Sequence, residues 1–80
     1  MKARIVDLDY CRGMYAFERE DGEYGYFELL GAPDLEIDDV LKGNFTDLGG
    51  TTVTRMETME RVDICIEDFC SLEIAKEQIH

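Results

Sequence analysis

Apolar and polar residues alternate along most of the chain, which is the pattern of half-buried β-strands. The alternation predicts strands at about residues 3–10, 14–20, 23–30, 40–46, 51–56 and 61–67. At about residues 69–79 the period changes to that of a helix with one apolar stripe. The last strand is the clearest, because apolar residues occupy every second position: Val62, Ile64 and Ile66. One face of that strand therefore belongs to the core.

The second and third strands are joined by Asp21-Gly22, which favours a type I′ hairpin turn. With this turn, the residues expected to face the core are Met14, Ala16, Phe27 and Leu29. The opposite face of the hairpin then gathers aromatic side chains with nearby arginines: Arg12, Tyr15, Phe17, Arg19, Tyr24 and Tyr26. Two alternatives stay open, namely a reversed register that buries this face, and cover by the helix or by another subunit.

The second half of the chain completes the predicted architecture. Leu41 and Phe45 are expected to point inward from the fourth strand, and the helix has its N-cap at Asp68 or at Ser71. There is no alternation of strands with helices, and closure removes unpaired edges from a small sheet. We therefore predict one mostly-β domain over residues 1–80, a five- to six-stranded antiparallel barrel with a C-terminal α-helix.

Charge narrows the range of partners. The chain has 19 acidic and 8 basic residues, a net charge of -11, which disfavours binding to a phosphate backbone and attracts a cationic partner such as a basic protein surface. Half of the basic residues lie in the first quarter of the chain: Lys2, Arg4, Arg12 and Arg19. The first hairpin is therefore the region where we expect a specific contact.

Residues with catalytic or metal-binding chemistry are sparse. The only histidine is His80, which leaves no triad or Cys–His arrangement in the sequence. The three cysteines, Cys11, Cys65 and Cys70, lack the spacing of a zinc site and are interpreted as small apolar side chains. Odd, unevenly spaced cysteines, no apolar leader and no apolar run of membrane-spanning length favour a cytoplasmic protein.

One connection is crowded with carboxylates: Asp34, Glu36, Asp38 and Asp39. The spacing is not that of an EF-hand, so we interpret it as a solvated acidic loop, with a weak cation site as the alternative. We expect no cofactor, no metal and no enzymatic activity.

The order of residues over the first 45 positions resembles the OB-fold family, and cold-shock domains within it. The segments that carry this resemblance are Arg12-Gly13-Met14-Tyr15-Ala16-Phe17, Asp21-Gly22, Tyr26-Phe27-Glu28-Leu29 and Leu35-Glu36-Ile37-Asp38-Asp39-Val40. The resemblance implies a five-stranded barrel and base-stacking roles for Tyr15, Phe17 and Tyr26. The chain departs from the cold-shock pattern at Tyr10, which stands alone where those domains have an aromatic pair, and at Ala16, which replaces a glycine. An OB-like or SH3-like barrel is the expected form.

These observations lead to three functional hypotheses. The first is a non-enzymatic interaction domain that binds a protein partner, or itself, through the aromatic hairpin face. The alternatives are a cold-shock-like binder of single-stranded nucleic acid, which the net charge disfavours, and an acidic mimic of nucleic acid. No membrane association is expected.

Overall fold

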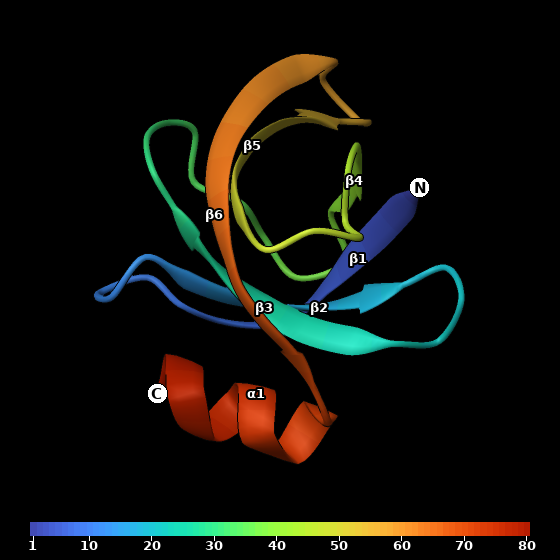
Figure 1. Ribbon diagram of the computed structural model, residues 1–80. Coiled ribbons are helices and arrows are strands. Elements are labelled where there is room, and N and C mark those ends of the chain that lie inside the picture. The colour runs from blue at the N-terminus through green and yellow to red at the C-terminus, as the bar shows by residue number, and fades with distance from the viewer.

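The computed structural model describes all residues from Met1 to His80. Six antiparallel strands close into a barrel and one helix lies outside it (Figure 1). The elements are β1 (Lys2–Asp9), β2 (Met14–Arg19), β3 (Tyr24–Leu29), β4 (Val40–Lys42), β5 (Gly49–Arg55), β6 (Glu60–Cys70) and α1 (Leu72–Ile79). The predicted mostly-β barrel with a C-terminal helix is confirmed, with six strands rather than the five implied by the resemblance.

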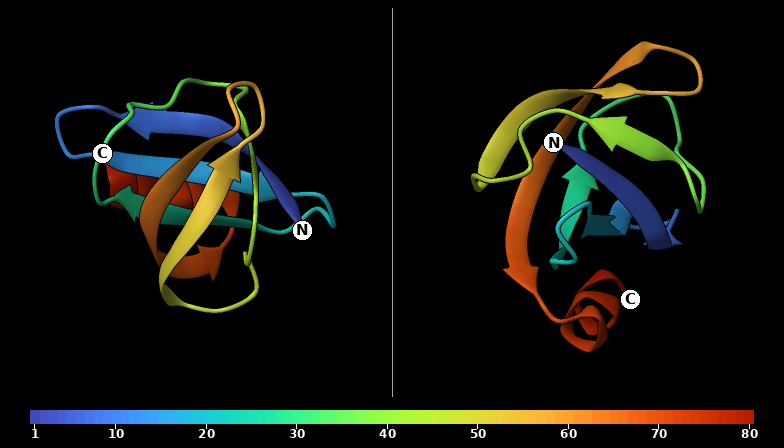
Figure 2. Two further views of the ribbon diagram at one scale, coloured as in Figure 1. Left: turned by 90° about the horizontal axis from the view of Figure 1, so that it is seen from above. Right: turned by 90° about the vertical axis from the view of Figure 1, so that its right-hand side faces the viewer.

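The barrel consists of two three-stranded meanders, β1–β2–β3 and β4–β5–β6, in the circular order β1-β2-β3-β6-β5-β4. The long β6 joins them, because its first part pairs with β5 and its second part with β3. A register shift between Tyr26 and Phe27 accompanies its curvature around the barrel (Figures 1 and 2). On the other side β4 pairs with β1 and closes the ring.

Twelve buried apolar side chains fill the barrel: Ala3, Ile5, Tyr15, Phe17, Phe27, Leu35, Leu41, Phe45, Val53, Val62, Ile64 and Ile66. Complete burial of one large apolar side chain contributes about 1.5–3 kcal/mol, so this cluster is the main source of stability. The predicted inward positions of Leu41 and Phe45 are confirmed, as is the core face of β6.

The predicted faces of β2 are wrong, and the turn explains the error. The Arg19 N–H donates to the Glu23 carbonyl at 2.7 Å and the Gly22 N–H donates to the Arg19 carbonyl at 2.9 Å, so three residues form the loop. Only Gly22 has a positive φ, +89°, whereas a type I′ turn needs positive φ at Asp21 as well. The register therefore differs by one residue from that of a two-residue turn, which exchanges the two faces of β2.

As a result, Tyr15 pairs with Phe27 and faces the core, together with Phe17. The rings of Tyr15 and Phe27 stack with centroids 5.3 Å apart, a favourable arrangement for aromatic pairs. Ala16 and Met14, which were expected in the core, point outward and pack beneath α1. The reversed register, left open as an alternative, is the correct one.

Element boundaries also differ from the prediction in the second half. β4 ends at Lys42 rather than near residue 46, and Phe45 reaches the core from the following loop. β6 continues to Cys70, so Phe69 lies opposite Gly25 in the sheet and not in the helix. Of the two proposed N-caps, Ser71 is correct, because its hydroxyl accepts the Ile74 N–H at 3.3 Å.

Helix α1 covers the outer face of the β1–β2–β3 meander (Figures 1 and 2). Ala75 and Ile79 are its buried residues, and they pack against Ala16. Two polar contacts hold its last turn: the Arg12 guanidinium donates to the Gln78 carbonyl at 3.0 Å, and His80 Nε2 lies 3.0 Å from an Asp7 carboxylate oxygen. This helix is too short and too polar to span a membrane.

Candidate functional site

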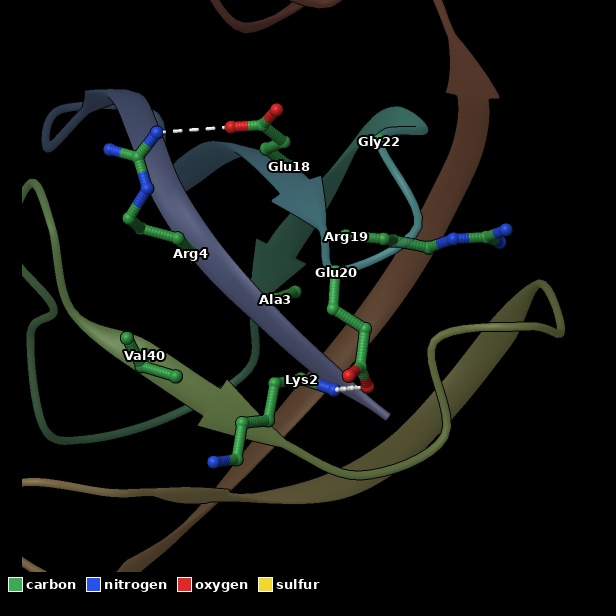
Figure 3. A pocket seen from close by; sticks show the side chains of 8 residues that line it. All are labelled: Lys2, Ala3, Arg4, Glu18, Arg19, Glu20, Gly22 and Val40. Carbon is green, nitrogen blue, oxygen red and sulfur yellow. Dashed lines mark hydrogen bonds and ion pairs between the residues drawn. The ribbon is translucent and has the colours of Figure 1, made fainter.

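The surface has one hollow, of about 320 Å³, which lies over the start of β1 and the tip of the β2–β3 hairpin (Figure 3). We call it the hairpin groove, and its lining residues are Lys2, Ala3, Arg4, Glu18, Arg19, Glu20, Gly22 and Val40. Three of these side chains are basic and two are acidic. The hollow therefore combines charges of both signs with the small apolar surface of Val40.

Two carboxylates hold Arg4 at the groove wall. One guanidinium nitrogen donates to Asp38 at 2.7 Å and the other to Glu18 at 3.0 Å, the second contact being visible in Figure 3. Hydrogen bonds to these two carboxylates raise the pKa of Arg4 above its ordinary value. Glu18 in turn raises the pKa of the Tyr24 hydroxyl, which lies opposite it on β3. Arg4 is held in one orientation at the groove wall, and Tyr24 borders the same wall.

Arg19 extends away from the groove centre (Figure 3) and braces the fold. It pairs with Asp21, donates to the Phe45 carbonyl at 3.1 Å, and lies 5.2 Å from the centroid of the Phe69 ring. The hydrogen bond from Arg19 also lowers the pKa of Asp21. These contacts join the hairpin tip to the loop after β4 and to β6, so Arg19 shapes the groove without being free to bind a partner.

A row of cations extends from the groove across the barrel wall. Lys2 lies opposite Lys42 in the β1–β4 pair, Lys42 lies opposite Thr54 on β5, and Thr54 lies opposite Arg61 on β6. We call Lys2, Lys42 and Arg61 the basic row; all three are exposed and none takes part in an ion pair. Together the groove and the row hold five of the eight basic residues.

The outer side of β3, and of β6 beyond Arg61, is acidic. Exposed carboxylates on the outer side of β3 and β6 form no ion pairs, and we call them the acidic flank: Glu28, Asp63, Glu67 and Asp68. Cys65 lies among them, opposite Glu28. The basic row and the acidic flank therefore meet on β6, where Arg61 and Asp63 lie two positions apart on the outer side.

The half-buried cysteines of this flank are poor nucleophiles. Burial, followed by the charges of Glu67 and Glu28, raises the pKa of the Cys65 thiol, and burial with the charge of Asp68 raises the pKa of Cys70. A raised pKa keeps the thiol protonated at neutral pH, whereas the thiolate is the reactive form. All three cysteines are free thiols.

The last two carboxylates of the acidic loop, Asp38 and Asp39, are held in contacts within the fold. Asp39 is buried, accepts the Glu36 N–H at 2.8 Å and pairs with Arg55 at 2.9 Å, while Asp38 is the partner of Arg4. No group of three or more His, Cys, Asp or Glu side chains is arranged to hold a metal ion. The Asp39–Arg55 pair was not predicted from the sequence. Arg55 could have indicated it, because it lies two positions after Val53 on β5 and therefore faces inward, where a buried arginine needs a carboxylate partner.

The six residues expected to form one aromatic face are not brought together. Tyr15 and Phe17 are fully buried in the barrel, and Tyr26 packs beside α1. Tyr24 borders the groove, Arg19 forms part of its lining, and Arg12 contacts the end of the helix. The groove residue Val40 was missed, because only the closure of β1 on β4 places it opposite Arg4.

No protein-family model, curated protein or solved structure matches the chain. The function is therefore inferred from the chemistry of the groove, the basic row and the acidic flank.

Proposed function

We propose that the chain is a non-enzymatic interaction domain that binds a protein partner at the hairpin groove and the basic row. The observation that carries this proposal is the position of the single hollow: three of the eight basic residues line it and two more, Lys42 and Arg61, continue from it in the basic row, in a chain of net charge -11. A concave surface with charges of both signs can bind a folded or extended protein segment, with a polar rim that sets its register.

The charge distribution of the chain indicates which charges its partner should carry. The overall charge attracts a basic protein over a distance, whereas the unpaired cations of the basic row need carboxylates at close range. The partner we propose is a protein with a basic surface that presents one or a few carboxylates to Lys2, Lys42 and Arg61. The rest of the outer wall, including the acidic flank, then contributes attraction without direct contact.

One further feature supports a protein partner over single-stranded nucleic acid. Stacking of bases needs exposed aromatic rings, and Tyr15 and Phe17 have none of their surface exposed. The three free thiols support the cytoplasm as the compartment we propose, because thiols persist where the environment is reducing. We also propose that the barrel is related to the OB fold.

A random-peptide display library, selected on the purified chain, tests the proposed function. We expect enriched peptides that contain both carboxylates and cations, and we expect Lys42→Glu to weaken their binding at least about tenfold, or 1.4 kcal/mol. Lys76→Glu is the matched control, because Lys76 is an exposed lysine on α1 with the same change of charge and no ion pair to lose. No enrichment above background, or equal loss in both variants, contradicts the proposal.

A further inference from the structure

One edge of β5 has no strand beside it. β5 pairs with β6 along its whole length, but its ladder with β4 is confined to Thr54 and Arg55. After Lys42, Gly43 still packs against Val53; the chain then leaves β5 and carries the Phe45 side chain into the core. Residues 49–53 therefore have a neighbouring strand on one side only.

The backbone groups on this edge can be identified from the alternation of the strand. The Arg55 carbonyl accepts the Met59 N–H on the β6 side, and the Asp63 carbonyl accepts the Leu30 N–H on the β3 side. Because successive residues of a strand point their N–H and C=O groups in opposite directions, Gly50 and Thr52 direct theirs away from β6. No backbone hydrogen bond outside the strand ladders reaches these four groups, and both residues are exposed.

The same segment is the longest uncharged stretch of the chain. The seven residues from Leu48 to Thr54 carry no charge, although 34% of all residues are charged. Leu48 is 59% exposed at the start of the strand. Edge strands of soluble proteins are normally protected by lysine, proline or a bulge, and this edge has none of them.

We propose that two copies of this chain associate through this edge, as an antiparallel pair of β5 strands about a two-fold axis at Thr51. Gly50 then lies opposite the partner's Thr52, and the four open groups of each copy are satisfied together. A second copy is the fitting occupant because it brings the same uncharged segment, so no charged side chain loses its hydration. A two-fold contact also closes on itself and gives a dimer rather than a fibre.

The β5 contact and binding at the hairpin groove are expected to depend on salt concentration in opposite directions. Each copy carries a net charge of -11, so the two copies repel one another, and salt screens that repulsion. The β5 contact therefore strengthens as the salt concentration rises. Binding of a charged partner to the basic row weakens under the same change, so either proposal can fail while the other holds.

Sedimentation velocity of the full chain, over a range of concentrations at low and high salt, tests the dimer. Thr52→Pro removes an N–H that forms no bond to β6, and we expect it to weaken association at least about tenfold, since proline blocks an edge. Thr52→Val is the matched control, because it also loses the hydroxyl contact to Asp63 but keeps the N–H. A chain that is monomeric at every concentration and salt, or a dimer that Thr52→Pro leaves intact, overturns the proposal.

Amide hydrogen exchange of the unmodified chain gives a second readout that does not depend on a variant folding. We expect the Gly50 and Thr52 amides to exchange more slowly as the concentration rises, while the β6-bonded amides of Thr51 and Val53 stay unchanged. Protection of Gly50 and Thr52 that is independent of concentration, or dimerisation that leaves both unprotected, contradicts the β5 contact.

Discussion

The inner and the outer face of the barrel wall use the same residue types in different ways. On the inside, Tyr15 and Phe17 stack or pack within the core and are inaccessible. On the outside, Tyr24 on the neighbouring strand borders a groove of charged residues. Adjacent aspartates show the same division, because Asp39 is buried against Arg55 and Asp38 is exposed beside Arg4. Position across the wall therefore determines whether a side chain stabilises the fold or is available to a partner.

The largest expected effect comes from the inner face of the first hairpin. Phe17→Ala removes a fully buried ring that packs against Phe27, Phe45 and Phe69, and we expect a loss of about 3–5 kcal/mol in the free energy of unfolding. Urea denaturation measures this loss. Tyr24→Ala, on the outer face of the same hairpin, serves as the control and should leave the midpoint nearly unchanged. Equal effects of the two variants would remove the distinction between the faces.

The two aspartates provide the next comparison. Asp39→Asn removes the nearer carboxylate of the largely buried Arg55 guanidinium and leaves only Glu60, at 3.9 Å, so we expect it to cost about 2–4 kcal/mol of stability. Asp38→Asn breaks an exposed pair, and asparagine tolerates the positive φ of 74° found there, so no measurable change is expected. Thermal unfolding of both variants measures the difference in their stability. Destabilisation by Asp38→Asn comparable to that of Asp39→Asn would contradict the assignment of Asp38 to the outer side.

Thiol reactivity compares exposed and half-buried cysteines. Burial and neighbouring carboxylates raise the pKa values of Cys65 and Cys70, so their thiolate fractions at mildly alkaline pH are below that of an ordinary thiol. We expect an alkylating reagent to modify exposed Cys11 first, and the other two to react faster only as the pH rises further. Peptide mapping by mass spectrometry shows the order in which the three cysteines are modified. Early modification of Cys65 would show that burial and the neighbouring carboxylates do not keep its thiol protonated.

The smallest effect on stability is expected at the basic row. Lys2 and Lys42 place like charges directly opposite one another, which is unfavourable in a sheet. Lys42→Glu replaces this repulsion with an attraction, so it should raise the unfolding free energy by about 0.2–1 kcal/mol while weakening partner binding. Differential scanning calorimetry at low salt measures the gain. A loss of stability together with a loss of binding would assign Lys42 to the fold rather than to the interface.

The barrel and much of its core were predictable, because local alternation determines which side of a strand is apolar. Val62, Ile64 and Ile66 define the core face of β6 without reference to any other segment. The register of the first hairpin was not predictable in the same way. Asp21-Gly22 suits both a two-residue turn and a three-residue loop with Gly22 at positive φ, and one residue of difference exchanges the faces.

The groove was beyond prediction for a different reason. Its lining depends on the pairing of β1 with β4, which are distant in sequence, and on the position of the hairpin tip beside them. Val40 carries no local pattern that distinguishes it from other surface residues. The uneven distribution of basic residues did indicate part of the groove lining, because Lys2, Arg4 and Arg19 all belong to it.

The most direct test of the proposed function is to map the binding surface by NMR, using the isotopically labelled chain and a peptide enriched by display. We predict that the amides of Lys2, Arg4 and Lys42 shift on titration, and that Lys42→Glu abolishes these shifts at the same peptide concentration. Shifts confined to the acidic flank, around Glu28 and Asp68, would contradict binding at the hairpin groove and the basic row.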